Sequence, residues 1–270
     1  MRARYGPRYS AVVLRPLAEQ LLGMFPVRAG QTACDLLCDS GVLTAALARA
    51  VAPQGAVIAA DVSADLVKAA YDAATHGTAQ VRTCITDGVV IPLKRHSCDV
   101  VASLLTLGFG DPGALITEAR QIVSPGGAMA IMHWDASIPP EHENALVRSL
   151  SDCAGYRSPF LDSVLSQVLG NGHTDRIRVR DVVRFDGFTD YWHACVAERP
   201  LGDELTALTD ELIGEVQAHT ARALERFTAA DGSLRIPVEA LVVTIAATRR
   251  RVSGTTRGGA ARPRREETLR

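Results

Sequence analysis

The sequence predicts an α/β protein built on a doubly wound parallel sheet. Short apolar runs typical of buried strands, five of them before residue 135, alternate with Ala- and Leu-rich stretches typical of helices. Strands joined through helices lie parallel and have right-handed crossovers, so the alternation predicts a sheet with helices on both faces. The chain has 270 residues, of which 47% are hydrophobic, which is enough to bury a full core.

The elements of the first half follow from its apolar pattern. The run at 98–105 is nearly all apolar, as expected for a strand covered on both faces. Ser63 is expected to cap one helix, and Asp111, which precedes a proline, is expected to begin another. The run SPGG at 124–127 is expected to end that helix before the next strand. The predicted strands are 32–37, 55–61, 80–88, 98–105 and 128–134, and the predicted helices are 42–52, 63–74 and 111–123.

The pattern changes in the second half. Residues 141–169 are expected to form one or two helices, 176–185 alternate as a strand does, and 233–249 are rich in strand-forming residues. Residues 187–228 are expected to form an inserted helical cap, long enough to cover the open end of a sheet. We therefore predict one domain over 1–248 that includes this cap.

The end of the chain differs in composition from the rest. Residues 249–270 hold eight arginines and two glutamates, although the whole chain has a net charge of −1. This segment has almost no apolar residues, which predicts a disordered tail. A nucleic-acid role could be argued from its arginines, but a solvated terminus in an Arg-rich protein is the preferred interpretation.

Composition also bears on compartment and metal binding. No apolar run approaches the roughly 20 residues that span a bilayer, so a membrane protein is not expected. The first residues lack the apolar region of a signal peptide, so we expect a cytoplasmic protein. The six cysteines have no disulfide-like spacing and no His cluster beside them, so we expect reduced, buried thiols and no metal site.

The ends of the predicted strands carry the candidate ligand-binding residues. In doubly wound sheets, ligands bind outside the carboxyl ends of the strands. Asp61 closes the second strand about 20 residues after the tight turn that ends at Gly41, the spacing at which a carboxylate accepts both ribose hydroxyls. No Walker lysine or phosphate-binding glycine run is present, so we expect a nucleoside rather than a phosphate-rich nucleotide.

Three successive segments resemble a known family. They are ACDLLCDSGVLTAALARA, AVIAADVSADLVKAAY and VRTCITDGVVIPLKRHSCDVVASLLTLGFGDPGALITEARQIVSPGGAMAIMHW. In order and spacing they resemble the motifs of class I S-adenosylmethionine (SAM) dependent methyltransferases, in the branch of the ubiquinone/menaquinone C-methyltransferases. The resemblance implies a seven-stranded sheet in the order 3-2-1-4-5-7-6 with the last strand antiparallel, and SAM as the cofactor.

The resemblance also implies a role for each position at the strand ends. Asp61 would bind the ribose hydroxyls and Val62 would pack against adenine, while Asp87, beside Gly88, would accept a hydrogen bond from the adenine amino group. Asp61 and Asp87 could instead be helix-capping or turn residues. The positions that would hold the methionine half are Asp35, Cys38, Asp39, Ser40 and Gly41, and those that would flank the sulfonium are Ser103 to Leu105.

The first turn departs from the family pattern. The family usually has Asp-x-Gly-Cys-Gly-Thr-Gly, whereas residues 35–41 read DLLCDSG. Asp39 would place a carboxylate near the SAM carboxylate, and two such charges about 4 Å apart repel by roughly 1–4 kcal/mol. Alternatively, Asp39 adopts the left-handed conformation that Asp tolerates and turns toward nearby amides or the SAM ammonium. The sequence therefore leaves SAM binding open.

Three functions fit these observations. The preferred one is SAM-dependent methyl transfer to a small, fairly apolar, natural-product-like molecule under the cap, with His133 as the nearest candidate base or else a packed histidine. The second is an enzyme that no longer transfers methyl groups and catalyses a cyclisation or rearrangement, with Asp39, His133 and His193 as acid/base groups and SAM absent or structural. The third is a non-catalytic subunit that supports a partner.

Overall fold

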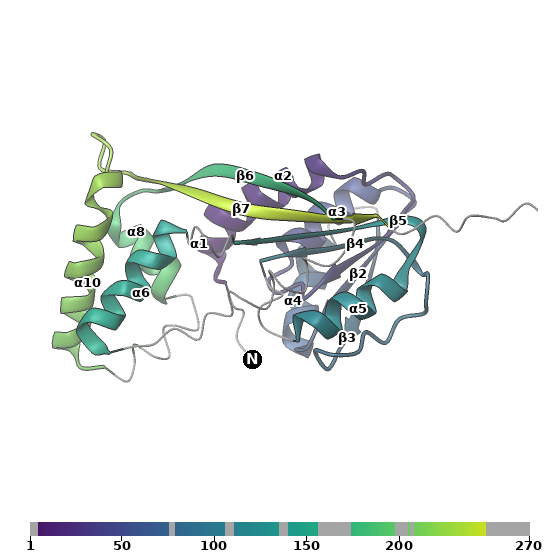
Figure 1. The fold of residues 1–270 in the computed structure, drawn as a ribbon, viewed down its shortest axis with the longest axis horizontal. Helices are drawn as coiled ribbons and strands as arrows, with labels where there is room; N and C mark the ends of the chain where they lie inside the picture. Colours follow the sequence, from purple (N-terminus) through teal and green to yellow (C-terminus); the bar gives the residue numbers. More distant parts are fainter. Residues whose placement is uncertain are drawn as a thin grey trace, which may run out of the picture.

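Seven strands form one mixed sheet in the computed structural model, in the order β3-β2-β1-β4-β5-β7-β6 (Figure 1). The first five strands pair in parallel, and β7 is antiparallel to both β5 and β6. This confirms the strand order and the antiparallel strand that the family resemblance implies. The structure describes residues 5–75, 79–105, 111–134, 140–155, 174–197, 205 and 208–246. The strands are β1 (Thr32–Leu36), β2 (Ala56–Asp61), β3 (Gln80–Ile85), β4 (Cys98–Leu104), β5 (Val123–Trp134), β6 (Thr174–Phe185) and β7 (Leu234–Ala246).

Helices cover both faces of the sheet because its central strands are apolar on both sides. One face packs against the N-terminal helices, α3 and α4, and the other packs against α5. Inside the sheet β1 and β4 are almost fully buried, whereas β3 is an edge strand with mostly exposed side chains. The helices are α1 (Pro7–Tyr9), η1 (Ser10–Leu14), α2 (Arg15–Met24), α3 (Val42–Val51), α4 (Ala64–Ala74), α5 (Pro112–Ile122), α6 (Glu141–Ala154), α8 (Phe188–Trp192), η3 (His193–Ala197), α10 (Asp210–Leu224) and η4 (Glu225–Phe227).

A group of helices lies at one end of the molecule. In Figure 1, α6, α8 and α10 stand together beyond the end of β5, joined to the sheet by the long strands β6 and β7. The Trp134 ring at the end of β5 meets the His142 ring of α6 edge-on, with centroids 5.5 Å apart. Helical structure is therefore present where 187–228 were expected to form a cap, although 198–204 and 206–207 lie outside the described residues. The expected tail at 249–270 also lies outside them.

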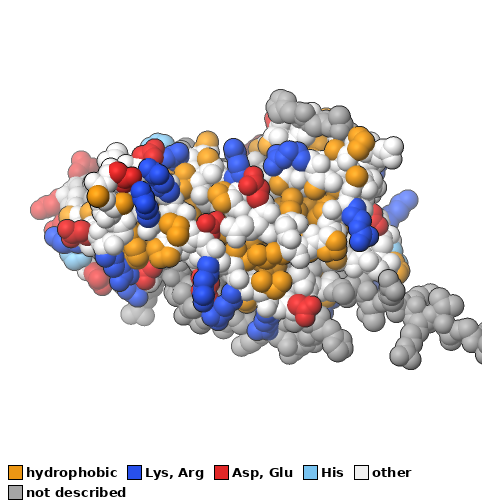
Figure 2. Space-filling view, turned by 90° about the horizontal axis from the view of Figure 1, so that it is seen from above, with side chains coloured by type: hydrophobic (Ala, Val, Ile, Leu, Met, Phe, Trp, Pro, Cys, Tyr) orange, Lys and Arg blue, Asp and Glu red, His pale blue; other side chains and the backbone are white. Residues whose placement is uncertain are grey.

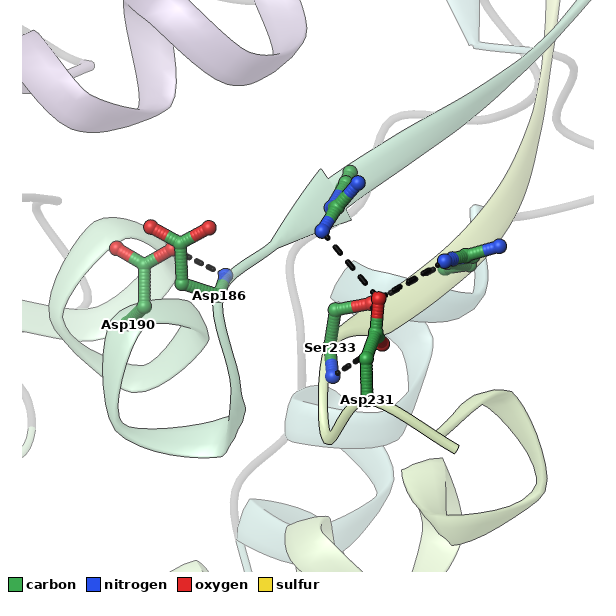
Figure 3. A network of polar contacts seen from close by, with 6 residues as sticks. Asp186, Asp190, Asp231 and Ser233 are labelled. Carbon is green, nitrogen blue, oxygen red and sulfur yellow. Dashed lines mark hydrogen bonds and ion pairs between the residues drawn. The ribbon is translucent and has the colours of Figure 1, made fainter. Parts of the chain in front are cut away.

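Ion pairs and hydrogen bonds hold together the ends of the paired strands β6 and β7. Asp231 accepts hydrogen bonds from Ser233 and forms ion pairs with Arg184 and Arg235 (Figure 3). Close by, Asp190 accepts the Asp186 amide at 2.8 Å. The guanidinium of Arg8 bridges to Asp190 at 2.6 Å, so the first helix is tied to the start of α8.

Three local details differ from the expectations. Strand β5 begins at Val123, so the SPGG run lies inside the strand, because Val123 already pairs with Cys98 across a register shift. Ser63 does not cap α4 with its side chain, whereas Asp111 does cap α5, accepting the amide of Ala114 at 3.0 Å. The helices before residue 25 were not anticipated, although their buried apolar positions recur at helical spacing: Val13, Leu14, Leu17, Ala18 and Leu21.

The surface is mixed in charge. On the face shown in Figure 2, acidic and basic side chains are interspersed and no continuous basic patch forms. Apolar side chains are also exposed on the edge strand β6, where Ile177 is 40% and Val182 is 55% exposed. Among the described helices, none combines the length and the apolar character needed to cross a bilayer.

Candidate cofactor site

The turn after β1 keeps the backbone of a glycine-rich turn although two of its residues are not glycine. Leu37, Asp39 and Gly41 have φ angles of 58°, 45° and 82°, so alternate positions are left-handed. Hydrogen bonds hold this shape, from the Cys38 amide to the Ala60 carbonyl at 3.0 Å and from the Gly41 amide to the Cys38 carbonyl at 2.9 Å. Such a conformation costs an ordinary residue about 1–2 kcal/mol, less for Asp. The left-handed backbone is therefore held in place even at the two positions that are not glycine.

Close packing between α3 and α4 requires a glycine at position 41. A Cβ atom at this position would lie 2.4 Å from the Cα of Ala70, so the start of α3 passes directly against α4. Glycine thus serves both the left-handed φ and the close approach of the two helices. The amide of Ala45 then bonds the Gly41 carbonyl at 2.9 Å and begins α3.

Asp61 joins the turn to the end of β2. Its side chain is fully buried, and it accepts the amide of Asp39 on Oδ2 and the amide of Ser63 on Oδ1, each at 3.2 Å. Each carboxylate oxygen has a further lone pair after one such bond. The structure therefore shows the turn role considered for Asp61, and its ribose role stays a prediction.

Asp35 is a buried carboxyl beside two others. The hydroxyl of Thr44 donates to its Oδ2 at 2.6 Å. Burial raises the pKa of Asp35 from its ordinary value of 3.8 to about 7, and the charges of Asp61 and Asp39 add to this against the Thr44 hydrogen bond. Burial is also the main cause that raises the pKa of the Cys38 thiol, and the negative charges of Asp35, Asp61 and Asp39 raise it further. This thiol therefore stays protonated. The predicted methionine side of the turn therefore gathers three carboxyl groups.

A small cavity opens onto this acidic region. Its volume is about 10 Å³, at the lower limit of what a single water molecule needs. The structure brings four of the predicted methionine-binding residues together at its wall, and the Ser40 hydroxyl lies 3.2 Å from that of Ser10 in the N-terminal helices. The lining residues are Leu14, Asp35, Leu37, Cys38, Asp39, Ser40, Val42, Leu43 and Leu104, and none of these nine is basic.

The predicted adenine side lies at the ends of β2 and β3. Gly88 is left-handed, with φ 86°, and a Cβ there would come within 3.5 Å of the Cγ1 of Val62. Asp87 is exposed, and its Oδ1 accepts the amides of Val89 and Val90 at 2.9 and 2.7 Å, which lowers its pKa. The structure thus places Val62 and Gly88 side by side, while Asp87 also stabilises its own loop as a turn residue would.

Ser103 and His133 are not among the residues that line the cavity. Alternate strand residues point to opposite faces of a sheet, so Ser103 points away from the face of Leu104, which does line it. His133 follows Met132 and lies on the Ser103 face, since Ser103 pairs with Ile131. Its Nδ1 is 2.7 Å from the Trp134 carbonyl. The predicted roles of both residues remain predictions.

A buried polar cluster near the site was not anticipated. The Tyr9 hydroxyl donates to Glu143 Oε1 at 3.0 Å and lies 3.1 Å from Nε2 of His142. The Tyr9 ring stacks on Tyr5, with centroids 4.8 Å apart, and the Tyr5 hydroxyl bonds the carbonyl of Leu105 just after β4. No local pattern indicates the hydrogen bonds of Tyr5 and Tyr9, because they join residues 100 or more positions apart.

Comparisons with known proteins agree with this geometry. Residues 33–127 match the family model for a methyltransferase domain. The chain is 30% identical over 128 residues to the nocamycin O-methyltransferase of Saccharothrix syringae, across 47% of this chain and 45% of that one. It is 32% identical over 122 residues to the demethylmenaquinone methyltransferase of Lactobacillus johnsonii, across 42% and 48%. The chain thus spans less than half the length of each of these relatives.

Solved structures share the fold at low sequence identity. Geranyl diphosphate C-methyltransferase from Streptomyces coelicolor A3(2) superposes with a TM-score of 0.51 at 14% identity, across 86% of this chain and 76% of that one. The [4+2]-cyclase SpnF superposes with a TM-score of 0.50 at 16% identity, across 87% and 82%. At such identities these likenesses show the fold alone.

The sheet order, the left-handed turn and the family match define a class I SAM-dependent methyltransferase domain. The family match places this methyltransferase domain at residues 33–127. Among the relatives, it is similar to demethylmenaquinone methyltransferases, the branch that the sequence motifs resemble.

Proposed function

We propose that this protein is a SAM-dependent methyltransferase that acts on a small, fairly apolar molecule held under the helical cap. The observation that carries the proposal is the turn after β1, which keeps its left-handed backbone and is joined by Asp61 to the end of β2. Left-handed residues other than glycine are strained and cluster at ligand-binding sites, so Leu37 and Asp39 mark this turn as a candidate ligand site.

The residues at this edge of the sheet fit SAM chemically. Asp61 offers carboxylate oxygens for the ribose, and Val62 and Gly88 offer an apolar surface for adenine. Asp39 supplies negative charge for the methionine half, and Asp35 adds to it where it is ionised, above about pH 7. When bound, SAM supplies an electrophilic methyl group on a sulfonium. The small volume of the cavity means that Leu14 and its neighbours in the N-terminal helices must move outward for the methionine half to enter.

The acceptor would sit between the sheet and the cap. Trp134 at the end of β5 packs against His142, and Tyr5 and Tyr9 stack beside the end of β4, so aromatic side chains line this region. Such a wall favours an apolar acceptor. Positioning the nucleophile against the methyl group supplies much of the rate of methyl transfer, and His133 is the candidate base where a proton must leave.

We further infer a cytoplasmic setting and a role in natural-product biosynthesis. The similarity to the nocamycin O-methyltransferase, whose name gives a natural-product substrate, supports the role in natural-product biosynthesis. The alternative function, a cyclisation or rearrangement without methyl transfer, is motivated by Asp39 and by a fold that the cyclase SpnF shares. The retained turn and the methyltransferase relatives favour methyl transfer over it.

Calorimetric titration of the purified chain with SAM and with S-adenosylhomocysteine (SAH) tests the proposal. Methyltransferase function predicts saturable binding of both ligands with one site per chain. A panel of phenolic and terpenoid acceptors with methyl-labelled SAM then tests for transfer. No detectable binding of either ligand would overturn the proposal and leave the cyclisation alternative.

A further inference from the structure

Asp39 adds a charge to the cofactor turn without changing its shape. Its φ of 45° lies in the left-handed region, which glycine adopts without strain. Its amide is engaged with Asp61, so the backbone is held independently of the carboxylate. What the substitution changes is therefore the electrostatics of the turn.

The added carboxylate is inside the protein. The Asp39 side chain is 2% exposed and lines the cavity together with Asp35 and Ser40. Asp35 is 1% and Asp61 is 0% exposed, so three buried carboxyl groups gather around one turn. A gathering of this kind is unfavourable for an anion and favourable for a cation, whereas a neutral group gains no such attraction, because charges interact strongly where water is excluded.

The two forms of the cofactor differ by one positive charge. SAM and SAH both carry an ammonium and a carboxylate on the amino-acid end, and only SAM carries the sulfonium. We propose that Asp39 makes the methionine side of this site selective for a cation, so that the protein binds SAM more tightly than SAH. The inference rests on the proposed function and adds a specificity-determining residue to it.

Such a preference has a consequence for turnover. Methyl transfer converts the cationic cofactor into a neutral thioether, because the methyl group leaves the sulfonium with the bond electrons remaining on sulfur. A site that favours the cation therefore releases SAH more readily and is less inhibited by it. A glycine turn carries no charge and lacks this contribution.

The test measures the ratio of two dissociation constants, SAH over SAM, in the full chain and in Asp39→Asn. Asparagine has the same size and also tolerates a left-handed φ, so it removes the charge alone. Sinefungin, which carries an amine in place of the methylated sulfur, repeats the measurement with a cation that cannot transfer a methyl group. Asp72→Asn, an exposed residue of α4 paired with Lys68, is the control for net charge.

We expect the ratio to fall about tenfold in Asp39→Asn, the change that 1.4 kcal/mol produces, and to stay unchanged in Asp72→Asn. An equal gain in affinity for both ligands would overturn the inference, since it would show repulsion of the carboxylate that both share. An unchanged ratio would overturn it as well. Failure of every form to bind either ligand would instead refute the proposed function and this inference with it. Thermal unfolding checks that each variant is folded, and Asp39→Gly replaces Asp39→Asn if the latter is not.

Discussion

The backbone amide of Asp39 donates a hydrogen bond to Oδ2 of Asp61, with 3.2 Å between the two atoms. The bond joins the turn after β1 to the last residue of β2, while the other oxygen of Asp61 accepts the amide of Ser63. A single buried carboxylate thus orders the turn and is also the predicted ligand of the ribose. Changes at Asp61 are therefore expected to act on both halves of the cofactor site.

Asp61→Ala should weaken the binding of SAM and SAH equally, by about 1.5–3 kcal/mol, the range for hydrogen bonds to a charged group. The effect is equal because both ligands carry the same ribose. Calorimetry with both ligands measures it, and Asp72→Asn again serves as the control. Unchanged affinity would remove Asp61 from the site, and a loss confined to SAM would assign it to the sulfonium instead.

Asp35 should make the stability of the ligand-free protein depend on pH. Its pKa is about 7 in the folded protein against an ordinary 3.8, so between these values the folded state holds a proton that the unfolded chain has released. The free energy of unfolding therefore falls as pH rises through this window, by about 1.4 kcal/mol per pH unit from this group, and levels off above about pH 7.

Asp35→Asn isolates this contribution, because asparagine can still accept the Thr44 hydroxyl but does not titrate. Urea unfolding at intervals from pH 4 to 8 should show the wild type losing stability relative to the variant as pH rises. The total difference should be about 4 kcal/mol. A difference that stays constant across this range would show that Asp35 is charged throughout.

Gly41→Ala should destabilise the protein more than Gly126→Ala does. Both glycines are left-handed, with φ of 82° and 86°, so both substitutions carry the conformational cost of about 1–2 kcal/mol. Only at Gly41 would the new methyl group meet backbone, 2.4 Å from the Cα of Ala70, while Gly126 has no neighbour within 4 Å. Chemical denaturation should show a further loss of about 1–3 kcal/mol for Gly41→Ala. Equal losses would mean that α4 moves away without cost.

Tyr9→Phe should cost about 1–3 kcal/mol of stability, because it removes the buried hydroxyl that donates a hydrogen bond to Glu143. Tyr71→Phe is the matched control, since this tyrosine lies on α4 and is 42% exposed. Urea unfolding compares the two variants. A loss no larger than that of Tyr71→Phe would show that the N-terminal helices are held by apolar packing and not by this hydrogen bond.

The α/β alternation was predictable because it depends on local patterns. Apolar runs, glycine positions and the residues at the ends of elements are visible in short windows, and they gave the parallel strands and the helices between them to within a few residues. The exceptions have physical causes. The SPGG run predicts the end of a helix, yet it lies within β5 because Val123 already pairs with Cys98 on the neighbouring strand. Pairing between strands depends on distant residues, so a local pattern does not reveal it.

The candidate site divides in the same way. The sequence by itself determined which residues stand at the strand ends, including the acidic turn from Asp35 to Gly41 and the carboxylate of Asp61, since these follow from spacing along the chain. Only the tertiary structure decided that Asp39 is left-handed and buried beside Asp35, and that His133 and Leu104 lie on opposite faces of the sheet. It alone brought Tyr9 to Glu143, across 134 positions of sequence. The burial of a side chain, its distance from other charged groups and the face of the sheet on which it lies all depend on which segments pack together. That packing is a property of the whole fold.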